Sequence, residues 1–118
     1  MTTKEEKQAR NKLIGQNIRF LREQRKMSVE ELAQRVNLSP VSLRLIEEGL
    51  RGITTQQLLA FQEALITTTD FLVTGKNDLS SQQRLNLMYS QLDEARRREV
   101  LDILAELLEH RPENGQEP

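Results

Sequence analysis

Two helix-start signals, eleven positions apart, most constrain how this chain can fold. Ser28 precedes a segment with apolar residues at 29, 32, 33 and 36, and Glu31 follows it by three positions, which is the capping-box pattern of a helix N-terminus. Ser39 then precedes Pro40, and proline suits the first position of a helix because that position needs no N–H donor. Asn37, a residue that tolerates a left-handed backbone, lies between them. The pattern predicts two short helices joined by a tight turn.

The rest of the sequence also favours helices. Ile14, Ile18 and Leu21 are spaced by four and three residues, which places them on one face of a helix expected over Asn11 to Arg25. Aromatic residues make up only 3% of the chain, so the core must use Leu, Ile, Val and Ala, which suit helices better than sheets. Further helix starts are expected at Thr55, Asp70, Ser80 or Ser81, and Asp93 or Glu94. We therefore expect an all-α fold.

The composition argues against metal, redox and enzymatic chemistry. The chain has no cysteine, which excludes disulfides, thiolate metal sites and a cysteine nucleophile. Its one histidine, His110, ends the last expected helix, where it complements the helix dipole and has no second metal ligand at a matching spacing. There is no glycine-rich phosphate loop, so we expect no catalytic residue, no metal and no cofactor. No apolar run approaches the roughly 20 residues of a membrane span, and the polar N-terminus lacks a secretory signal, so we expect a cytoplasmic protein.

Charge divides the chain into two parts. Residues 1–76 carry 12 basic and 9 acidic side chains, a balance of +3, whereas residues 77–118 carry 5 and 9, a balance of −4. Such an asymmetry suggests parts with different tasks. The expected organisation is a basic N-terminal arm or helix extension over 1–12, a five-helix domain over 13–76, a C-terminal helical association region over 77–110 and a disordered tail over 111–118.

The stretch from Met27 to Gly49 resembles the helix-turn-helix of the lambda repressor/Cro-like family, also called the XRE family of prokaryotic regulators. Ala33 falls where the two helices of the motif would cross, and a larger side chain there would push them apart. Leu43 and Ile46 would anchor the second helix. The resemblance covers Ile14 to Gly75. It implies a five-helix lambda repressor-like DNA-binding domain in a prokaryotic, phage-encoded or plasmid-encoded protein.

In this family the second helix of the motif lies in the DNA major groove. The matching outward positions here are Pro40, Val41, Ser42, Arg44 and Leu45. Arg44 could read guanine, Ser42 could bind a base or a phosphate, and the three apolar residues could contact only a thymine methyl. The remaining candidates for contact with DNA are Ser28, Arg19, Arg35, Arg51 and the N-terminal Lys4, Lys7, Arg10 and Lys12. For Arg19 and Arg35 the alternative is an ordinary surface charge, and for the N-terminal residues a solvated helix extension.

The resemblance also identifies a structural ion pair and several departures from the family pattern. Arg22 and Glu47 match two residues that form a buried salt bridge in family members, which would orient the helices. Val29 stands where a Gln often holds a phosphate, and Glu48 and Leu50 replace a frequent Asn and a frequent Lys. These replacements weaken the expected hold on the DNA backbone.

The C-terminal region carries apolar stripes that need a covering surface. The stripe residues are Leu85, Met88 and Leu92 on the first expected helix, and Val100, Leu101, Leu104, Leu107 and Leu108 on the second. They could pack on the first domain or against a second copy of the chain. Most homo-oligomers have two-fold symmetry, and dimeric helix-turn-helix proteins bind two half-sites about one DNA turn apart, so we expect a homodimer.

We therefore expect a sequence-specific DNA-binding transcriptional regulator, with repression as its simplest mode. It would bind double-stranded operator DNA as a dimer through the helix that starts at Pro40. The alternative is a helix-turn-helix-shaped protein-interaction module, or a regulatory partner, with weak or no DNA binding. The apolar face of this helix and the acidic pI of 5.9 motivate that alternative, in which a protein partner replaces DNA.

Overall fold

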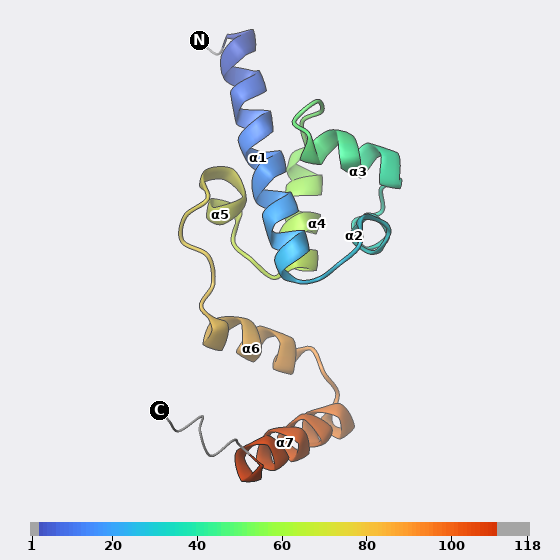
Figure 1. The fold of residues 1–118 in the computed structure, drawn as a ribbon, viewed down its shortest axis with the longest axis vertical. Coiled ribbons are helices and arrows are strands. Elements are labelled where there is room, and N and C mark those ends of the chain that lie inside the picture. Colours follow the sequence, from blue (N-terminus) through green and yellow to red (C-terminus); the bar gives the residue numbers. More distant parts are fainter. Residues whose placement is uncertain (1–2, 111–118) are drawn as a thin grey trace. The chain divides into compact units, whose positions relative to one another are not determined.

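The computed structural model describes residues 3–110, which form seven helices and no strand, as the sequence predicted (Figure 1). The helices are α1 (Lys4–Gln24), α2 (Val29–Arg35), α3 (Pro40–Glu47), α4 (Thr55–Leu65), α5 (Thr69–Thr74), α6 (Ser81–Ser90) and α7 (Glu94–Glu109). The chain divides between Ser80 and Ser81 into two compact units. The first unit contains α1 to α5 and the second contains α6 and α7. The tail expected over 111–118 lies outside the described residues.

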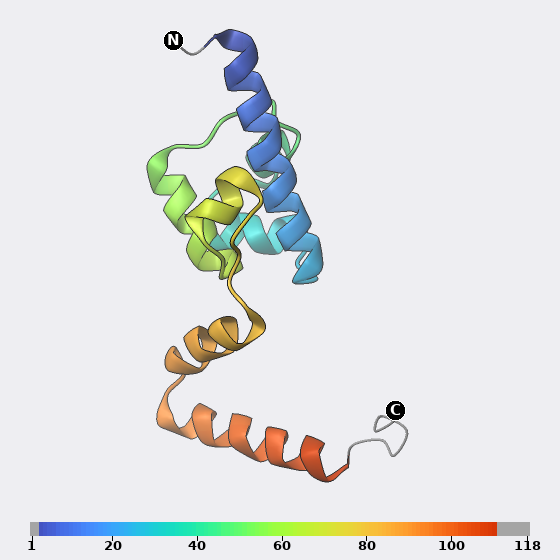
Figure 2. The same cartoon turned by 90° about the vertical axis from the view of Figure 1, so that its left-hand side faces the viewer.

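The first unit has a core built from its five helices. Helix α1 packs against α3 and α5, α2 lies against α3, and α4 contacts α1, α2 and α5 (Figures 1 and 2). Ile18 and Leu21 of α1, Leu43 and Ile46 of α3, and Phe61 of α4 are among its fully buried side chains. Aliphatic residues therefore make most of the core, as the composition required.

Gly15 lies where α1 crosses α3. A Cβ atom at this position would lie 2.2 Å from the carbonyl oxygen of Ile46 and 2.7 Å from that of Glu47. Both distances are shorter than van der Waals contact between a carbon and an oxygen, and both partners are backbone atoms that cannot turn aside. The glycine therefore sets how closely α3 approaches α1.

The capping signals around the motif form as predicted. The Ser28 hydroxyl accepts a hydrogen bond from the Glu31 N–H at 3.0 Å, and the Glu31 carboxylate accepts one from the Ser28 N–H at 2.7 Å. Ser39 caps α3 with Pro40 in its first turn. Asn37 adopts the left-handed conformation, with φ at 60°, in the turn between α2 and α3. Local hydrogen bonds thus define where α2 and α3 each begin.

Helix α1 includes residues 4–12, the segment for which the sequence left an arm or a helix extension open. It begins at Lys4, whereas the apolar spacing indicated a start at Asn11. The cause is a second capping box, in which the Thr3 hydroxyl accepts from the Glu6 N–H and the Glu6 carboxylate accepts from the Thr3 N–H. Apolar periodicity could not reveal this extension because its residues, Thr3 to Arg10, are all exposed.

The predicted cap residues of α4 and α5 were wrong, although α4 itself begins at Thr55. Thr54, not Thr55, caps α4, and its side chain accepts a hydrogen bond from the Gln57 N–H. Thr68, not Asp70, caps α5. In each case a threonine hydroxyl earlier in the chain satisfies a free N–H of the first turn, so the cap lies before the predicted residue.

The second unit consists of α6 and α7, and Arg97 of α7 binds the C-terminal end of α6. Asp93 caps α7, one of the two predicted starts, and accepts from the Arg96 N–H. The Arg97 guanidinium lies 5.4 Å from the centre of the Tyr89 ring and donates to the carbonyl oxygens of Tyr89 and Ser90 at 3.1 and 2.9 Å. These bonds close the C-terminal end of α6, yet neither helix contains a fully buried residue.

Neither a membrane-spanning helix nor a cluster of metal ligands occurs among the described residues. Between residues 3 and 110, no helix has both the length and the apolar character needed to cross a membrane. Over the same range, no three His, Asp or Glu side chains gather as metal ligands would.

Candidate nucleic-acid interface

Helix α3 is held on one side and exposed on the other. Leu43 and Ile46 are buried in the core, whereas the side chain of Arg44 is exposed and Val41 is 65% exposed. The other three outward positions, Pro40, Ser42 and Leu45, are half-buried. The exposed side of α3 therefore combines apolar surface with one charged and one hydroxyl group.

Arg51 lies beside this exposed side although it comes from the loop after α3. Its Nη1 atom donates to the Ser42 hydroxyl at 2.9 Å. The Ser42 oxygen also lies 3.0 Å from the hydroxyl of Ser39, the cap of α3. The Arg51 guanidinium is thus hydrogen-bonded to the first turn of α3. Its partner Ser42 is close to Val41 and Arg44 in the sequence. The sequence indicated Arg51 as a candidate but not this contact.

Arg44 is paired with a residue of the neighbouring helix. Its Nη2 atom lies 3.5 Å from Oε2 of Glu30, in the first turn of α2, and the two side chains are 54% and 66% exposed. The sequence did not identify Glu30 as a functional candidate. Residues 14 positions apart on different helices have no fixed spacing that a sequence pattern could reveal.

Arg22 and Glu47 form the ion pair that the family resemblance implied. Arg22 Nε donates to Glu47 Oε2 at 2.7 Å, Nη2 donates to Oε1 at 3.1 Å, and Nη1 donates to the carbonyl oxygen of Met27 at 3.0 Å. The hydrogen bond to Glu47 is the main reason that the pKa of Arg22 is raised above its ordinary value. Because a raised arginine pKa favours the folded state below the ordinary pKa, this contribution is present throughout the neutral range and is lost only in strong base.

The other predicted contact residues belong to α1 and α2. Arg19 of α1 is exposed and pairs with Glu23 at 3.2 Å. Arg35 is exposed at the last position of α2, and Ser28 uses its hydroxyl as the cap of that helix. The basic N-terminal residues Lys4, Lys7, Arg10 and Lys12 are exposed on the first three turns of α1.

A shallow cavity of about 210 Å³ connects three helices on this surface. Its lining residues are Arg19, Arg22, Val29, Arg44, Glu47 and Glu48. Three arginines and two glutamates therefore share one hollow, and Val29 supplies its apolar wall. Basic residues from α1 and α3 thus lie on one surface, although 25 positions separate Arg19 from Arg44 in the chain.

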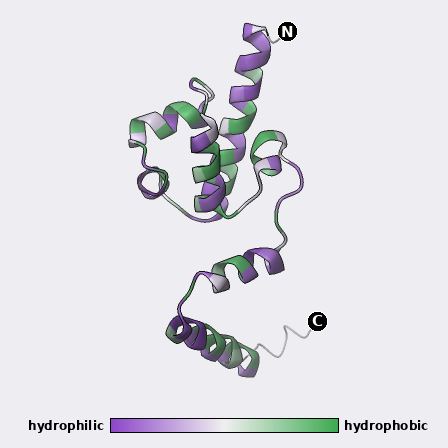
Figure 3. Cartoon of the chain, turned by 180° about the vertical axis from the view of Figure 1, so that it is seen from behind, coloured by the Kyte–Doolittle hydropathy of each residue, from purple (hydrophilic) through white to green (hydrophobic). Residues whose placement is uncertain are grey.

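The second unit exposes the apolar residues that the sequence assigned to association. Leu85, Met88, Leu101, Leu104, Leu107 and Leu108 are exposed, and Leu92 and Val100 are half-buried. Ile103 and Leu87 are also exposed, and the sequence reasoning missed both. For Ile103 the signal was available, because Val100, Ile103 and Leu107 follow the i, i+3, i+7 spacing of one helix face. Hydrophobic and hydrophilic colours alternate along α7 in Figure 3.

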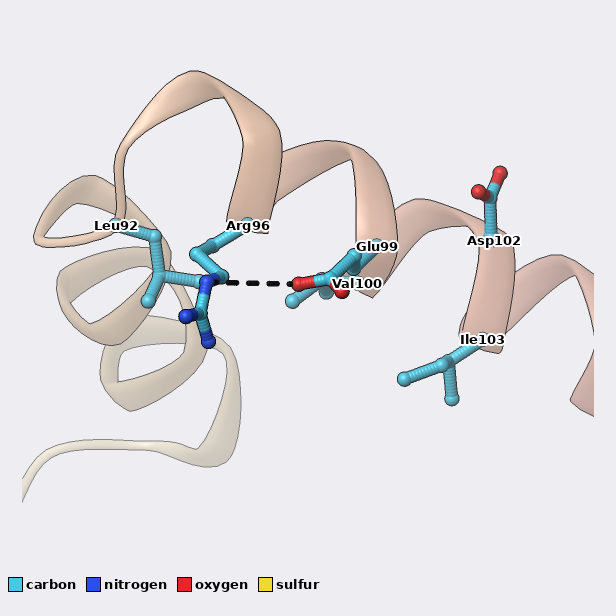
Figure 4. A pocket seen from close by; sticks show the side chains of 6 residues that line it. All are labelled: Leu92, Arg96, Glu99, Val100, Asp102 and Ile103. Carbon is cyan, nitrogen blue, oxygen red and sulfur yellow. Dashed lines mark ion pairs between the residues drawn. The ribbon is translucent and has the colours of Figure 1, made fainter.

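A cavity of about 480 Å³ runs along the start of α7. It is lined by Leu92, Arg96, Glu99, Val100, Asp102 and Ile103. Figure 4 shows Arg96 and Glu99 extending toward each other, with 3.7 Å between Nε and Oε1, while Asp102 points away from Ile103. Apolar side chains of a further helix could enter beside Val100 and Ile103.

Comparisons with known proteins agree with this arrangement. Residues 18–72 match the family model HTH_3, described as helix-turn-helix. The regulator of clp genes ClgR from C. glutamicum is similar in structure, with a TM-score of 0.51, 22% identity, and coverage of 52% of this chain and 80% of that chain. At that identity the likeness concerns the fold alone. A chain of the complex between the SinR and SinI proteins has a TM-score of 0.50 and 27% identity, and the match covers 78% of this chain and 94% of that chain. No curated protein sequence matches the chain.

Proposed function

We propose that this chain, whose residues 18–72 match the helix-turn-helix family model, is a transcriptional regulator of the XRE family that binds operator DNA through α3. The observation that carries the proposal is the orientation of α3. Leu43 and Ile46 are buried while Val41 and Arg44 are exposed, so the outer side of the helix is free to enter a major groove.

The residues on that side determine what α3 can recognise. Arg44 can donate two hydrogen bonds to guanine, which is the most common specific contact in the major groove. Val41 and Leu45 can contact thymine methyl groups, which discriminate by shape more than by hydrogen bonding. We therefore expect a half-site in which guanine and thymine lie close together.

Phosphate contacts come from basic residues around α3. Arg51 is tied to Ser42 at the first turn of α3, and Arg19 lines the same hollow as Arg44. Exposed basic side chains on the first turns of α1, such as Lys4 and Lys7, could extend the contact along the backbone. Such contacts fix the position of the protein on DNA but carry no sequence information.

We further propose that the second unit makes the protein a homodimer. On α7 the apolar residues Leu101, Leu104, Leu107 and Leu108 are exposed in the single chain. A stripe of this width is stable only when another surface covers it. A two-fold dimer would also present two copies of α3 to two half-sites, which increases affinity for a symmetric operator.

The charges of α7 support an antiparallel arrangement of the two copies. Although Glu94 suits the helix N-terminus, Arg96 to Arg98 follow it at the positive end of the dipole, and Glu106 and Glu109 lie at the negative end. Both clusters are unfavourable for a single helix. In an antiparallel pair, each arginine cluster would lie near the acidic end of the partner helix, which would turn both costs into attraction.

Repression is the simplest regulatory mode for such a protein, because a dimer seated on a promoter excludes polymerase without a further activity. The experiment begins with selection of preferred duplexes from a random DNA pool. Binding of the selected and random duplexes is then measured at about 50 mM and 200 mM salt. We expect the selected duplex to bind at least about 10³-fold more tightly than random DNA, and both affinities to fall as salt increases. Absence of any retained duplex at the lower salt concentration contradicts DNA binding.

The alternative is a protein-interaction module that uses the same surface. It is favoured by two exposed apolar side chains, Val41 on α3 and Leu50 in the following loop, and by the exposed carboxylate of Glu48. The similarity to a chain of the SinR–SinI complex also agrees with a protein partner. In this case DNA would not bind even at low salt, and replacing Val41 with a polar residue would abolish the protein complex.

A further inference from the structure

The pairing between Arg44 and Glu30 bears directly on sequence recognition. Arg44 is the one charged side chain among the outward positions of α3, and it reaches back to the first turn of α2. The pair joins the two helices of the motif, with Nη2 3.5 Å from Oε2. The contact occupies one guanidinium nitrogen and leaves the remaining N–H groups for other acceptors.

The position of the carboxylate decides which acceptors Arg44 can reach. An unrestrained arginine at a DNA surface can bind either a phosphate or a base edge, and only the base edge carries sequence information. Glu30 is negatively charged and 66% exposed, so it repels phosphate in its own neighbourhood. Glu30 therefore disfavours contacts between Arg44 and a phosphate on the α2 side. The guanidinium N–H groups that Glu30 does not bind stay available for other acceptors.

We propose that Glu30 is a specificity-determining residue that orients Arg44 toward a base edge and withholds it from the DNA backbone. The proposal rests on the DNA binding proposed above. Glu30 is a positioning residue, because it acts through the guanidinium of Arg44. Its effect is on the ratio between specific and non-specific affinity more than on affinity alone.

A second ion pair of the same domain provides a matched control. Glu23 pairs with Arg19 at 3.2 Å, and both side chains are exposed, as in the Glu30–Arg44 pair. Arg19 belongs to α1, outside the outward positions of α3. Each of the variants Glu23→Gln and Glu30→Gln therefore removes a negative charge that lies beside an arginine. Only Glu30→Gln releases the arginine of α3.

The experiment measures binding of each full-length variant to the selected duplex and to a random-sequence duplex. For Glu30→Gln we expect affinity for random DNA to rise about three- to fivefold, which corresponds to loss of one exposed ion pair, while affinity for the selected duplex does not rise. The specificity ratio, which is the affinity for the selected duplex divided by the affinity for random DNA, should fall by the same factor. Glu23→Gln should change both affinities alike and leave the ratio unchanged. Circular dichroism and thermal melting verify that each variant is folded.

A double variant tests whether Glu30 acts through Arg44. In an Arg44→Ala background, Glu30→Gln should no longer change the specificity ratio, because the side chain that it orients is gone. Equal gains on both duplexes for Glu30→Gln, as expected for Glu23→Gln, would overturn the inference and leave the proposed DNA binding intact. A chain that retains no duplex at low salt overturns both.

Discussion

The guanidinium of Arg22 holds the carboxylate of Glu47 by two hydrogen bonds, at 2.7 and 3.1 Å, across the crossing of α1 and α3. The two side chains are only 11% and 5% exposed. The same guanidinium binds the carbonyl oxygen of Met27 just before α2. One side chain of α1 therefore fixes α3 and the approach to α2, which sets the geometry of the whole motif.

Removal of one partner of this pair is expected to destabilise the domain strongly. Glu47→Ala leaves the Arg22 cation buried without its carboxylate, which typically costs about 3–5 kcal/mol in the free energy of unfolding. Urea denaturation measures the loss. Glu23→Ala breaks the exposed pair with Arg19 and should cost less than about 1 kcal/mol. Similar losses for the two variants would contradict a structural role for Arg22.

We expect that no residue larger than glycine is tolerated at position 15, where α1 crosses α3. Gly15→Ala places a Cβ atom 2.2 Å from the Ile46 carbonyl oxygen, so the helices must separate, at an expected cost of about 1–3 kcal/mol or more. Gly52→Ala is the control, because its Cβ would first meet the Asn11 side-chain oxygen at 3.0 Å, and that side chain can move. Thermal melting should therefore show a much larger decrease in Tm for Gly15→Ala than for Gly52→Ala.

The capping box of α2 is expected to respond to acid. Hydrogen bonds to Ser28 lower the pKa of the Glu31 carboxyl below its ordinary value. A lowered carboxyl pKa means that stabilisation is present above the ordinary pKa and is lost as the pH falls through the lowered one. In the Glu31→Gln variant the side-chain oxygen can still accept a hydrogen bond from the Ser28 N–H, but the group does not titrate. The free energy of unfolding should therefore depend less on pH over the acidic range in which Glu31 becomes protonated. Carboxyl chemical shifts of Glu31 in an NMR titration test the pKa directly, and a midpoint at the ordinary value contradicts the cap.

Arg44 is expected to matter for recognition more than Arg35. If Arg44 reads a base, Arg44→Ala should weaken binding to the selected duplex by about 1–3 kcal/mol and relax the preference at one position of each half-site. Arg35 is at the last position of α2, outside the outward positions of α3, so we expect a phosphate contact from it and a similar loss of affinity for all duplexes in Arg35→Ala. Unchanged preference in repeated selection with Arg44→Ala would remove Arg44 from base recognition.

Charge on the apolar stripe of α7 is expected to dissociate the dimer. The unaltered chain should have the mass of a dimer at micromolar concentration by light scattering. Leu104→Lys places a charge within the stripe and should give a monomer that still folds, because α7 has no buried residue in the single chain. Leu59→Lys changes an exposed leucine on α4, outside the stripe, and should leave the mass unchanged. A monomeric unaltered chain contradicts the proposed association.

The sequence predicted the parts of the fold that depend on residues close together in the chain. The capping box of α2 and the Ser39–Pro40 start of α3 could be recognised because donor and acceptor lie three positions apart. The same rule could have revealed the Thr3–Glu6 box that lengthens α1. It was missed because apolar periodicity, which exposed residues lack, was used to locate that helix.

The candidate interface could be predicted only in part. Spacing along α3 and resemblance to a family indicated which residues would turn outward, and Val41 and Arg44 are indeed exposed. No spacing rule connects Glu30 with Arg44 or Arg51 with Ser42, because each pair depends on how separate segments pack.

The amino-acid sequence alone therefore determined where the helices of the motif begin and which of their faces are apolar, since both depend on hydrogen bonds and periodicity within one or two turns. Only the tertiary structure decided which carboxylate each arginine meets and how closely α1 approaches α3 at Gly15. Those properties depend on distances between segments that the chain brings together only when its core is buried.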